Sequence, residues 1–140
     1  PIKITFRYEI PDYALRGEGE MFFRPMVMNN LYNQVRSYIW IDTSVENRKY
    51  GFKDGCSRLV ELDETIQLPA GYKLVSAAKD ETMQGVGADF EGSLVQKGNK
   101  VLLHNRLALK KRVYEASDWE SFRNAVNAHK AYGEYLVIKK

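Results

Sequence analysis

The chain is poor in the residues that carry most enzyme chemistry: its 140 residues include one cysteine and two histidines. A single cysteine excludes a disulfide framework within the chain. A metal site needs several His, Cys or carboxylate ligands at suitable spacing, and the isolated histidines His104 and His129 do not supply that pattern. The sequence therefore predicts no bound metal and no cofactor.

Long apolar runs and concentrated charge are also missing. No apolar stretch approaches the roughly 20 residues of a membrane-spanning helix. The formal net charge is +3, and basic residues alternate with acidic ones along most of the chain. A nucleic-acid-binding domain usually gathers its basic residues on one face, whereas the longest basic run here is "KKR" at 110–112. We expect neither membrane insertion nor a nucleic-acid partner, and we interpret the basic run as a charged strand edge.

The chain is rich in alternation between apolar and polar residues, which indicates β-strands. The pattern is strongest in "IKITFRYEI" (2–10) and returns in 21–28, 35–45, 58–68 and 89–115. Gly98-Asn99 divides the last of these into two strands, Asp54-Gly55 is a further hairpin signal, and "LPAGY" (68–72) predicts a turn. The polar, glycine-containing segment 79–88 predicts a mobile loop. These features predict a mainly β, antiparallel β-sandwich.

The last 25 residues follow a different pattern. Ser117 and Glu120 form an S-x-x-E capping box, and an apolar stripe at helical spacing follows it. Gly133 is placed for a left-handed C-terminal cap, and "EYLVIKK" returns to strand. We therefore expect one C-terminal helix that covers apolar surface of the sandwich, followed by a final strand. The stripe consists of Trp119, Phe122, Ala125 and Val126.

By size the chain forms a single domain spanning 1–140. It opens with Pro1 directly before an alternating segment, which is more typical of a fragment cut from a longer protein than of a complete chain.

Several segments together resemble a known family. They are "LPAGYKLVSA", "GADFEGSLVQKGNKVLLHNRLALKKRVYEASDW" with "SFRNAV" after it, and the closing "YLVIKK". This stretch, from about Arg48 to Lys140, resembles the C-terminal β-domain of large bacterial transglutaminase-like proteins of the cysteine-peptidase type. The resemblance implies an exported Gram-negative protein, periplasmic or in the cell envelope, whose papain-like Cys-His-Asp core precedes this domain. None of the matching positions is catalytic in the family.

The candidate catalytic groups are better explained as structural residues. Cys56 is the one possible thiol nucleophile, but it lies in a β-pattern rather than at the start of a helix, and we expect it to be a small residue beside a turn. We expect His129 to interact with the dipole at the C-terminal end of the helix. Glu61, Asp63 and Glu64 could form an acid/base pair, although carboxylates that alternate with aliphatic residues usually mark a solvated face.

The segment "GVGADF" (85–90) is similar to a phosphate loop only in its glycines. It leads into a strand, whereas a phosphate loop leads into a helix N-terminus. We therefore predict no catalytic residues, and we expect the isolated chain not to be an enzyme.

Four aromatic residues, Tyr32, Tyr38, Trp40 and Tyr50, form the candidate surface for a partner or ligand. Aromatic side chains at such positions serve core packing, domain contacts or stacking on sugar rings.

Two hypotheses follow. The first is a non-catalytic accessory domain that supports the neighbouring catalytic domain of the same chain or helps to bind a peptide substrate. The alternative is a carbohydrate-binding β-sandwich module that binds a glycan through these four residues.

Overall fold

The computed structural model describes residues 3–5, 7–28, 41–76 and 78–140. The described elements form one long sheet, two smaller sheets and a C-terminal helix. In chain order they are β1 (Leu15–Arg16), β2 (Glu20–Phe23), β3 (Phe52–Lys53), β4 (Arg58–Gln67), β5 (Lys73–Ser76), β6 (Glu81–Gln84), β7 (Ala88–Lys97), β8 (Lys100–Leu109), β9 (Val113–Tyr114), the 3-10 turn η2 (Ala116–Asp118), α2 (Trp119–Ala131) and β10 (Leu136–Lys139).

The first layer is a long antiparallel sheet with strand order β4-β8-β7-β6. Strands β4, β7 and β8 have ten residues each, and their side chains alternate between a buried and an exposed face. The β7–β8 hairpin turns at Gly98-Asn99, with Lys97 opposite Lys100 and a φ of 62° at Gly98. Glycine adopts this conformation without strain and opens the tight turn, as the sequence predicts.

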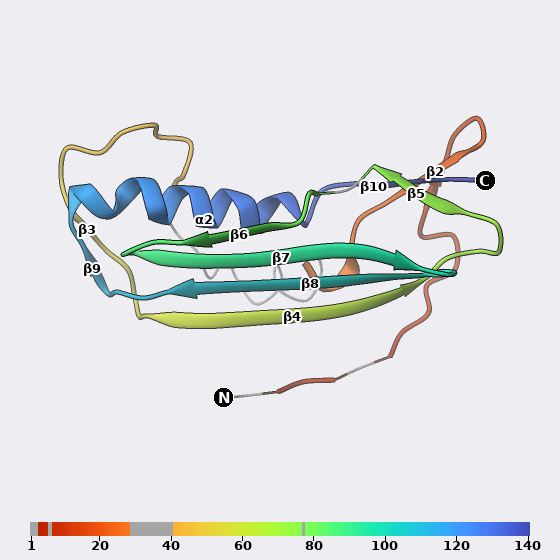
Figure 1. Ribbon diagram of the computed structural model, residues 1–140, viewed down its shortest axis with the longest axis horizontal. Coiled ribbons are helices and arrows are strands. Elements are labelled where there is room, and N and C mark those ends of the chain that lie inside the picture. Colours follow the sequence, from red (N-terminus) through yellow and green to blue (C-terminus); the bar gives the residue numbers. More distant parts are fainter. Residues whose placement is uncertain (1–2, 6, 29–40, 77) are drawn as a thin grey trace.

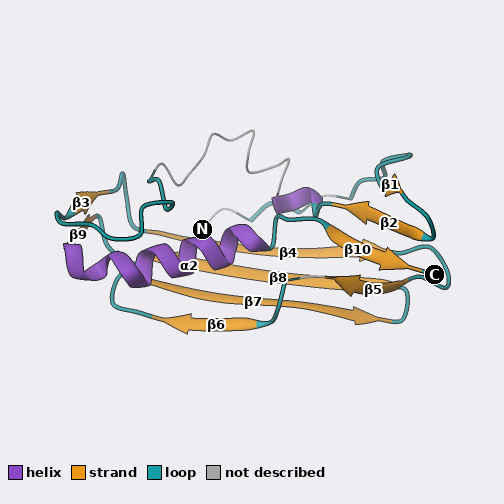
Figure 2. Ribbon diagram, turned by 90° about the horizontal axis from the view of Figure 1, so that it is seen from above, coloured by secondary structure: helices purple, strands orange, loops and turns teal. Residues whose placement is uncertain are grey.

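The second layer covers the inner face of the long sheet and has two parts (Figure 1). The helix α2 lies along one half, and the short antiparallel sheet β1-β2-β10-β5 lies over the other. Figure 2 shows the same division from above. The final strand β10 occupies an inner position in the short sheet, between β2 and β5. The prediction of a mainly antiparallel β fold with a C-terminal helix and a final strand is therefore confirmed.

One apolar core joins the two layers. The helix contributes Trp119, Phe122 and Val126, of which Phe122 and Val126 are fully buried. Phe122 packs edge-on against Phe52 and Tyr114, with both pairs of ring centroids 5.0 Å apart. The predicted apolar stripe thus fills the space between the helix and the sheet.

The helix is capped differently from the prediction. Ser117 is exposed, and the capping box lies two positions earlier, at the start of the 3-10 turn η2 that leads into α2, where the Glu115 N–H donates to Asp118 Oδ2 over 2.9 Å. Lys111 Nζ donates to the same carboxylate at 2.7 and 2.8 Å, and this charge-assisted bond lowers the pKa of Asp118. The prediction is displaced by two residues because the 3-10 turn η2 precedes α2 and carries the capping box at its own start.

The C-terminal end of the helix also differs. Gly133 does not have the positive φ of a left-handed cap. Instead the chain leaves α2 through bonds between residues three apart, from the Gly133 N–H to the Lys130 carbonyl and from the Glu134 N–H to the Ala131 carbonyl. These bonds satisfy the last carbonyls of the helix without a left-handed residue.

The predicted strand 2–10 is wrong in its described part, because residues 3–5 and 7–10 belong to no strand. Ile4 is 70% exposed and Ile10 is 39% exposed. An alternating segment forms a strand only where a sheet edge accepts its backbone hydrogen bonds. Here the side-chain hydroxyl of Tyr8 provides a contact to the long sheet, by donating to Glu64.

Three local expectations also need correction. The predicted loop 79–88 contains the edge strand β6, and the backbone N–H of Gly87 donates to Ser121 Oγ on α2 over 3.3 Å. Asp54-Gly55 does not join two paired strands, because β3 pairs with β9. The strand β8 ends at Leu109, so Lys110–Arg112 is no strand edge. Lys110 instead pairs with Asp89 at 2.7 Å.

Candidate functional surface

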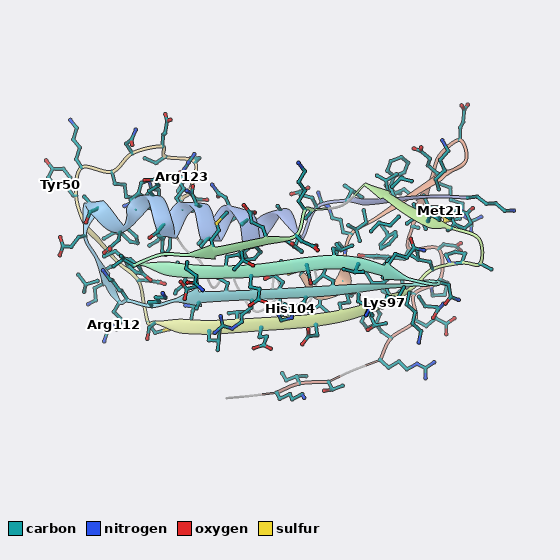
Figure 3. All side chains as sticks on the ribbon, in the orientation of Figure 1. Met21, Tyr50, Lys97, His104, Arg112 and Arg123 are labelled. Atoms are coloured by element: carbon teal, nitrogen blue, oxygen red, sulfur yellow. The ribbon has the colours of Figure 1, made fainter. Side chains whose placement is uncertain are left out.

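The long sheet has one face that neither α2 nor the short sheet covers, and we call it the outer face. Its side chains alternate with those that form the core, because successive residues of a strand point to opposite sides. In register across β4, β8 and β7, Asp63 lies opposite His104, and His104 lies opposite Ser93. Figure 3 labels His104 on this sheet and Arg123 on α2.

Asp63 and His104 are hydrogen-bonded across the two strands. His104 Nδ1 lies 2.8 Å from Asp63 Oδ1, and the two side chains are 30% and 75% exposed. A shallow hollow of about 330 Å³ adjoins them, and Thr65, Ser93 and Leu102 contribute to its lining. The outer face therefore offers an imidazole, carboxylates and hydroxyls around a small apolar floor.

The row Asp63, His104, Ser93 has the residue types of a serine-hydrolase triad but not its connections. Such a triad needs a hydrogen bond between the serine and the imidazole, together with donors for an oxyanion. Among the described residues no hydrogen bond joins Ser93 to His104, whose imidazole is hydrogen-bonded to Asp63 instead. The row is thus a polar pair beside a serine.

Cys56 is exposed and lies two residues before β4. From Arg58, where β4 begins, to Asp63, opposite His104, the strand extends roughly 17 Å at its usual rise. The other histidine, His129, contacts Asn105, which lies opposite Leu62. Neither imidazole is close enough to activate this thiol, as a Cys–His nucleophile requires.

His129 connects the helix to the sheet. It is 2% exposed, and its Nδ1 lies 2.6 Å from the side-chain oxygen of the fully buried Asn105. Burial lowers the pKa of His129 to about 4, so the imidazole is neutral at pH 7. The expected interaction of a charged His129 with the helix dipole is therefore wrong, because desolvation outweighs the attraction of the helix end.

Glu64 has a structural role, and not the acid/base role that the sequence suggested for it. It points into the molecule, where its carboxylate accepts the backbone N–H groups of Met26 at 3.0 Å and Val27 at 3.1 Å. Burial and the Glu64 carboxylate raise the pKa of Tyr8, whose hydroxyl donates to the same group. Glu64 thereby fastens the N-terminal part of the chain to β4.

The aromatic candidate surface is described in one position. Tyr32, Tyr38 and Trp40 lie outside the described residues. Tyr50 is 81% exposed and lies at the end of the molecule beside β3 (Figure 3).

Glu61, Asp63 and His104 form a group that the sequence alone did not predict. Their ligand atoms lie within 4.8 Å of one another. The histidine is 41 residues from Asp63 along the chain, so the pairing register of β4 and β8 is needed to bring them together. The i, i+2 spacing of Glu61 and Asp63, which places both carboxylates on one face of a strand, was the sequence signal for part of this group.

The fold and these positions can now be compared with known proteins. Residues 19–137 match a family described as a domain of unknown function with a solved structure, DUF3858. This chain belongs to the DUF3858 family. The match covers every strand from β2 to β9 and the whole of α2.

A solved structure shares the fold of this DUF3858 chain. It is the crystal structure of a protein described as a "putative protease" from Parabacteroides distasonis ATCC 8503, with a TM-score of 0.67 and 12% sequence identity. The similarity covers 88% of this chain and 24% of the other, so the chain spans about a quarter of that protein's length. No curated protein matches the chain. In the described residues, no helix has the length and apolar character needed to cross a membrane.

Proposed function

We propose that this DUF3858 chain is a non-catalytic accessory domain of a longer, transglutaminase-like protein of the cysteine-peptidase type. In this role it supports the neighbouring catalytic domain of the same polypeptide or helps it to bind a peptide substrate. The protein acts in the periplasm or the cell envelope, as the sequence resemblance implies.

The observation that carries the proposal is the relation between the chain and its structural relative. The fold matches 24% of a protein that is described as a "putative protease". In the described part of this chain the one thiol lies before the start of β4, whereas His104 lies opposite Asp63 in the middle of that strand and His129 contacts Asn105 on β8. A domain that recurs within a larger protein and does not assemble a Cys–His pair fits an accessory role.

The packing supports the same reading. The inner face of the long sheet is filled by the helix and the short sheet, and Tyr114, Phe122 and Tyr132 are at most 1% exposed there. Substrate-binding sites are usually concave clefts. In this chain the space between the layers is occupied by side chains instead.

A deletion experiment tests the proposal. The longer polypeptide is produced with and without residues 1–140, and both forms are assayed for peptide hydrolysis and for amine incorporation into a glutamine peptide. We expect the shortened form to keep a measurable activity with a lower kcat/KM, and the separately purified chain to restore part of the loss. An activity that disappears entirely and returns only with an intact Cys56 would assign catalysis to this chain and refute the proposal.

The carbohydrate-binding alternative has its own test. The chain is titrated with oligosaccharides while its tryptophan fluorescence is recorded. Saturable quenching that a Trp40→Ala variant abolishes would replace the accessory role with glycan recognition. We expect no saturable change.

A further inference from the structure

The outer face carries a mixed set of ligand groups that the proposed function does not use. Glu61 and Asp63 project from β4, and His104 projects from β8 directly opposite Asp63. One ligand atom from each lies within 4.8 Å of the other two. Such a set, an imidazole nitrogen with two carboxylates, differs in kind from a purely acidic cluster.

Two features hold these groups together. The strand β8 is paired along its whole length with β4 on one side and β7 on the other, so the backbone positions of the set are fixed. The Asp63 carboxylate also contacts His104 Nδ1 at 2.8 Å, which orients the imidazole ring. The set therefore depends on the rigid part of the fold and not on a loop.

We propose that Glu61, Asp63 and His104 bind a divalent transition-metal ion such as Zn²⁺. Imidazole nitrogen and carboxylate oxygen are normal zinc ligands at about 2.0–2.2 Å. Because Asp63 and Glu61 are exposed, small rotations of their side chains bring the three ligand atoms to these distances. A hard ion such as Mg²⁺ prefers oxygen ligands alone, and the histidine therefore favours the transition metal.

The hollow beside the set leaves room for the remaining ligands. It borders Asp63 and His104 on the solvent side of the sheet, where Thr65 and Ser93 supply hydroxyl groups. Three protein ligands leave at least one coordination position open on zinc. Water fills that position in the isolated chain.

A positive residue in register with the set should modulate metal binding. Arg106 lies opposite Glu61 on one side and opposite Glu91 on the other. Its guanidinium competes with a metal for Glu61, whereas Glu91 offers it a second carboxylate. Removing this positive charge should strengthen metal binding.

The test is a calorimetric titration of the untagged chain with ZnCl₂. All proteins carry Cys56→Ser, because the exposed thiol is itself a zinc ligand. We expect one zinc ion per chain, binding at least about tenfold weaker in Glu61→Gln and lost in His104→Ala, since loss of a group that only hydrogen-bonds to a metal ligand already costs roughly 10–100-fold. Glu120→Gln, which removes an exposed carboxylate from α2, is the control and should bind as the parent does, while Arg106→Gln should bind more tightly.

A structural readout accompanies the titration. The imidazole resonances of His104 should shift on addition of ZnCl₂, and those of the buried His129 should not. Circular dichroism confirms that each variant is folded before it is titrated. Zinc binding that survives His104→Ala, or no binding to the folded Cys56→Ser parent, would overturn the inference without affecting the proposed accessory role.

Discussion

Replacing Phe122 by alanine tests how far the helix α2 holds the two layers together. Phe122 is 0% exposed, and its ring lies 5.0 Å from the rings of Phe52 and Tyr114 and 5.9 Å from that of Trp119. A buried Phe→Ala change costs about 3–5 kcal/mol, because it loses transfer free energy and leaves a cavity. The lost ring contacts favour the upper half of that range, so we expect about 4 kcal/mol.

This loss is large beside the roughly 5–15 kcal/mol by which a domain is stable. It corresponds to a fall in Tm of about 8–16 °C for a domain of this size. Urea unfolding followed by tryptophan fluorescence and by circular dichroism measures it. Asn124→Ala, on the exposed side of the same helix, is the matched control and should change the free energy of unfolding by no more than about 0.5 kcal/mol. A loss below about 1 kcal/mol for Phe122→Ala would show that the packing of α2 does not hold the two layers together.

Three further predictions concern buried groups. The pKa of His129 falls from 6.5 to about 4 on folding. The contribution of the neutral His129 to the free energy of unfolding is therefore fully present above pH 6.5 and is lost as the pH falls toward 4. The loss reaches about 3 kcal/mol, and urea midpoints at pH 7 and pH 4 should differ less in His129→Gln than in the parent. Gly92→Ala places a methyl group 2.5 Å from the Tyr132 ring and should cost at least about 1–3 kcal/mol in thermal unfolding. Gly55→Ala is the control and should cost little, because no described atom outside the adjacent residues lies nearer than 4.0 Å to the added methyl group. Glu64→Gln turns an amide donor toward backbone N–H groups and should cost about 1–3 kcal/mol in the same thermal unfolding assay. An unchanged Tm would contradict the role of this carboxylate as the acceptor for the Met26 and Val27 N–H groups.

The parts of the fold that are set by neighbouring residues could be predicted from the sequence. The apolar stripe of Trp119, Phe122 and Val126 marks the helix, because its spacing matches one helical face. Gly98 marks the β7–β8 turn, since a tight hairpin needs a residue that accepts positive φ. The turn after β4 was predicted from Pro69 and the glycine that closes the motif, and Gly71 has a φ of 83° there.

The parts that depend on distant pairing could not be predicted. The alternation in residues 2–10 indicates a strand but does not show whether a sheet edge is available to pair with it. Glu64 looked like one more carboxylate on a solvated face, but the register of β4 turns it inward, toward Met26 and Val27. The Asp63–His104 pair likewise exists only in the observed register of β4 and β8.

The activity of the purified 140-residue chain tests the central claim most directly. The chain and its Cys56→Ser variant are incubated with a fluorogenic peptide library and with a glutamine peptide plus an amine donor. The accessory role predicts no turnover above the buffer rate in either protein. Turnover by the chain that Cys56→Ser abolishes would contradict it.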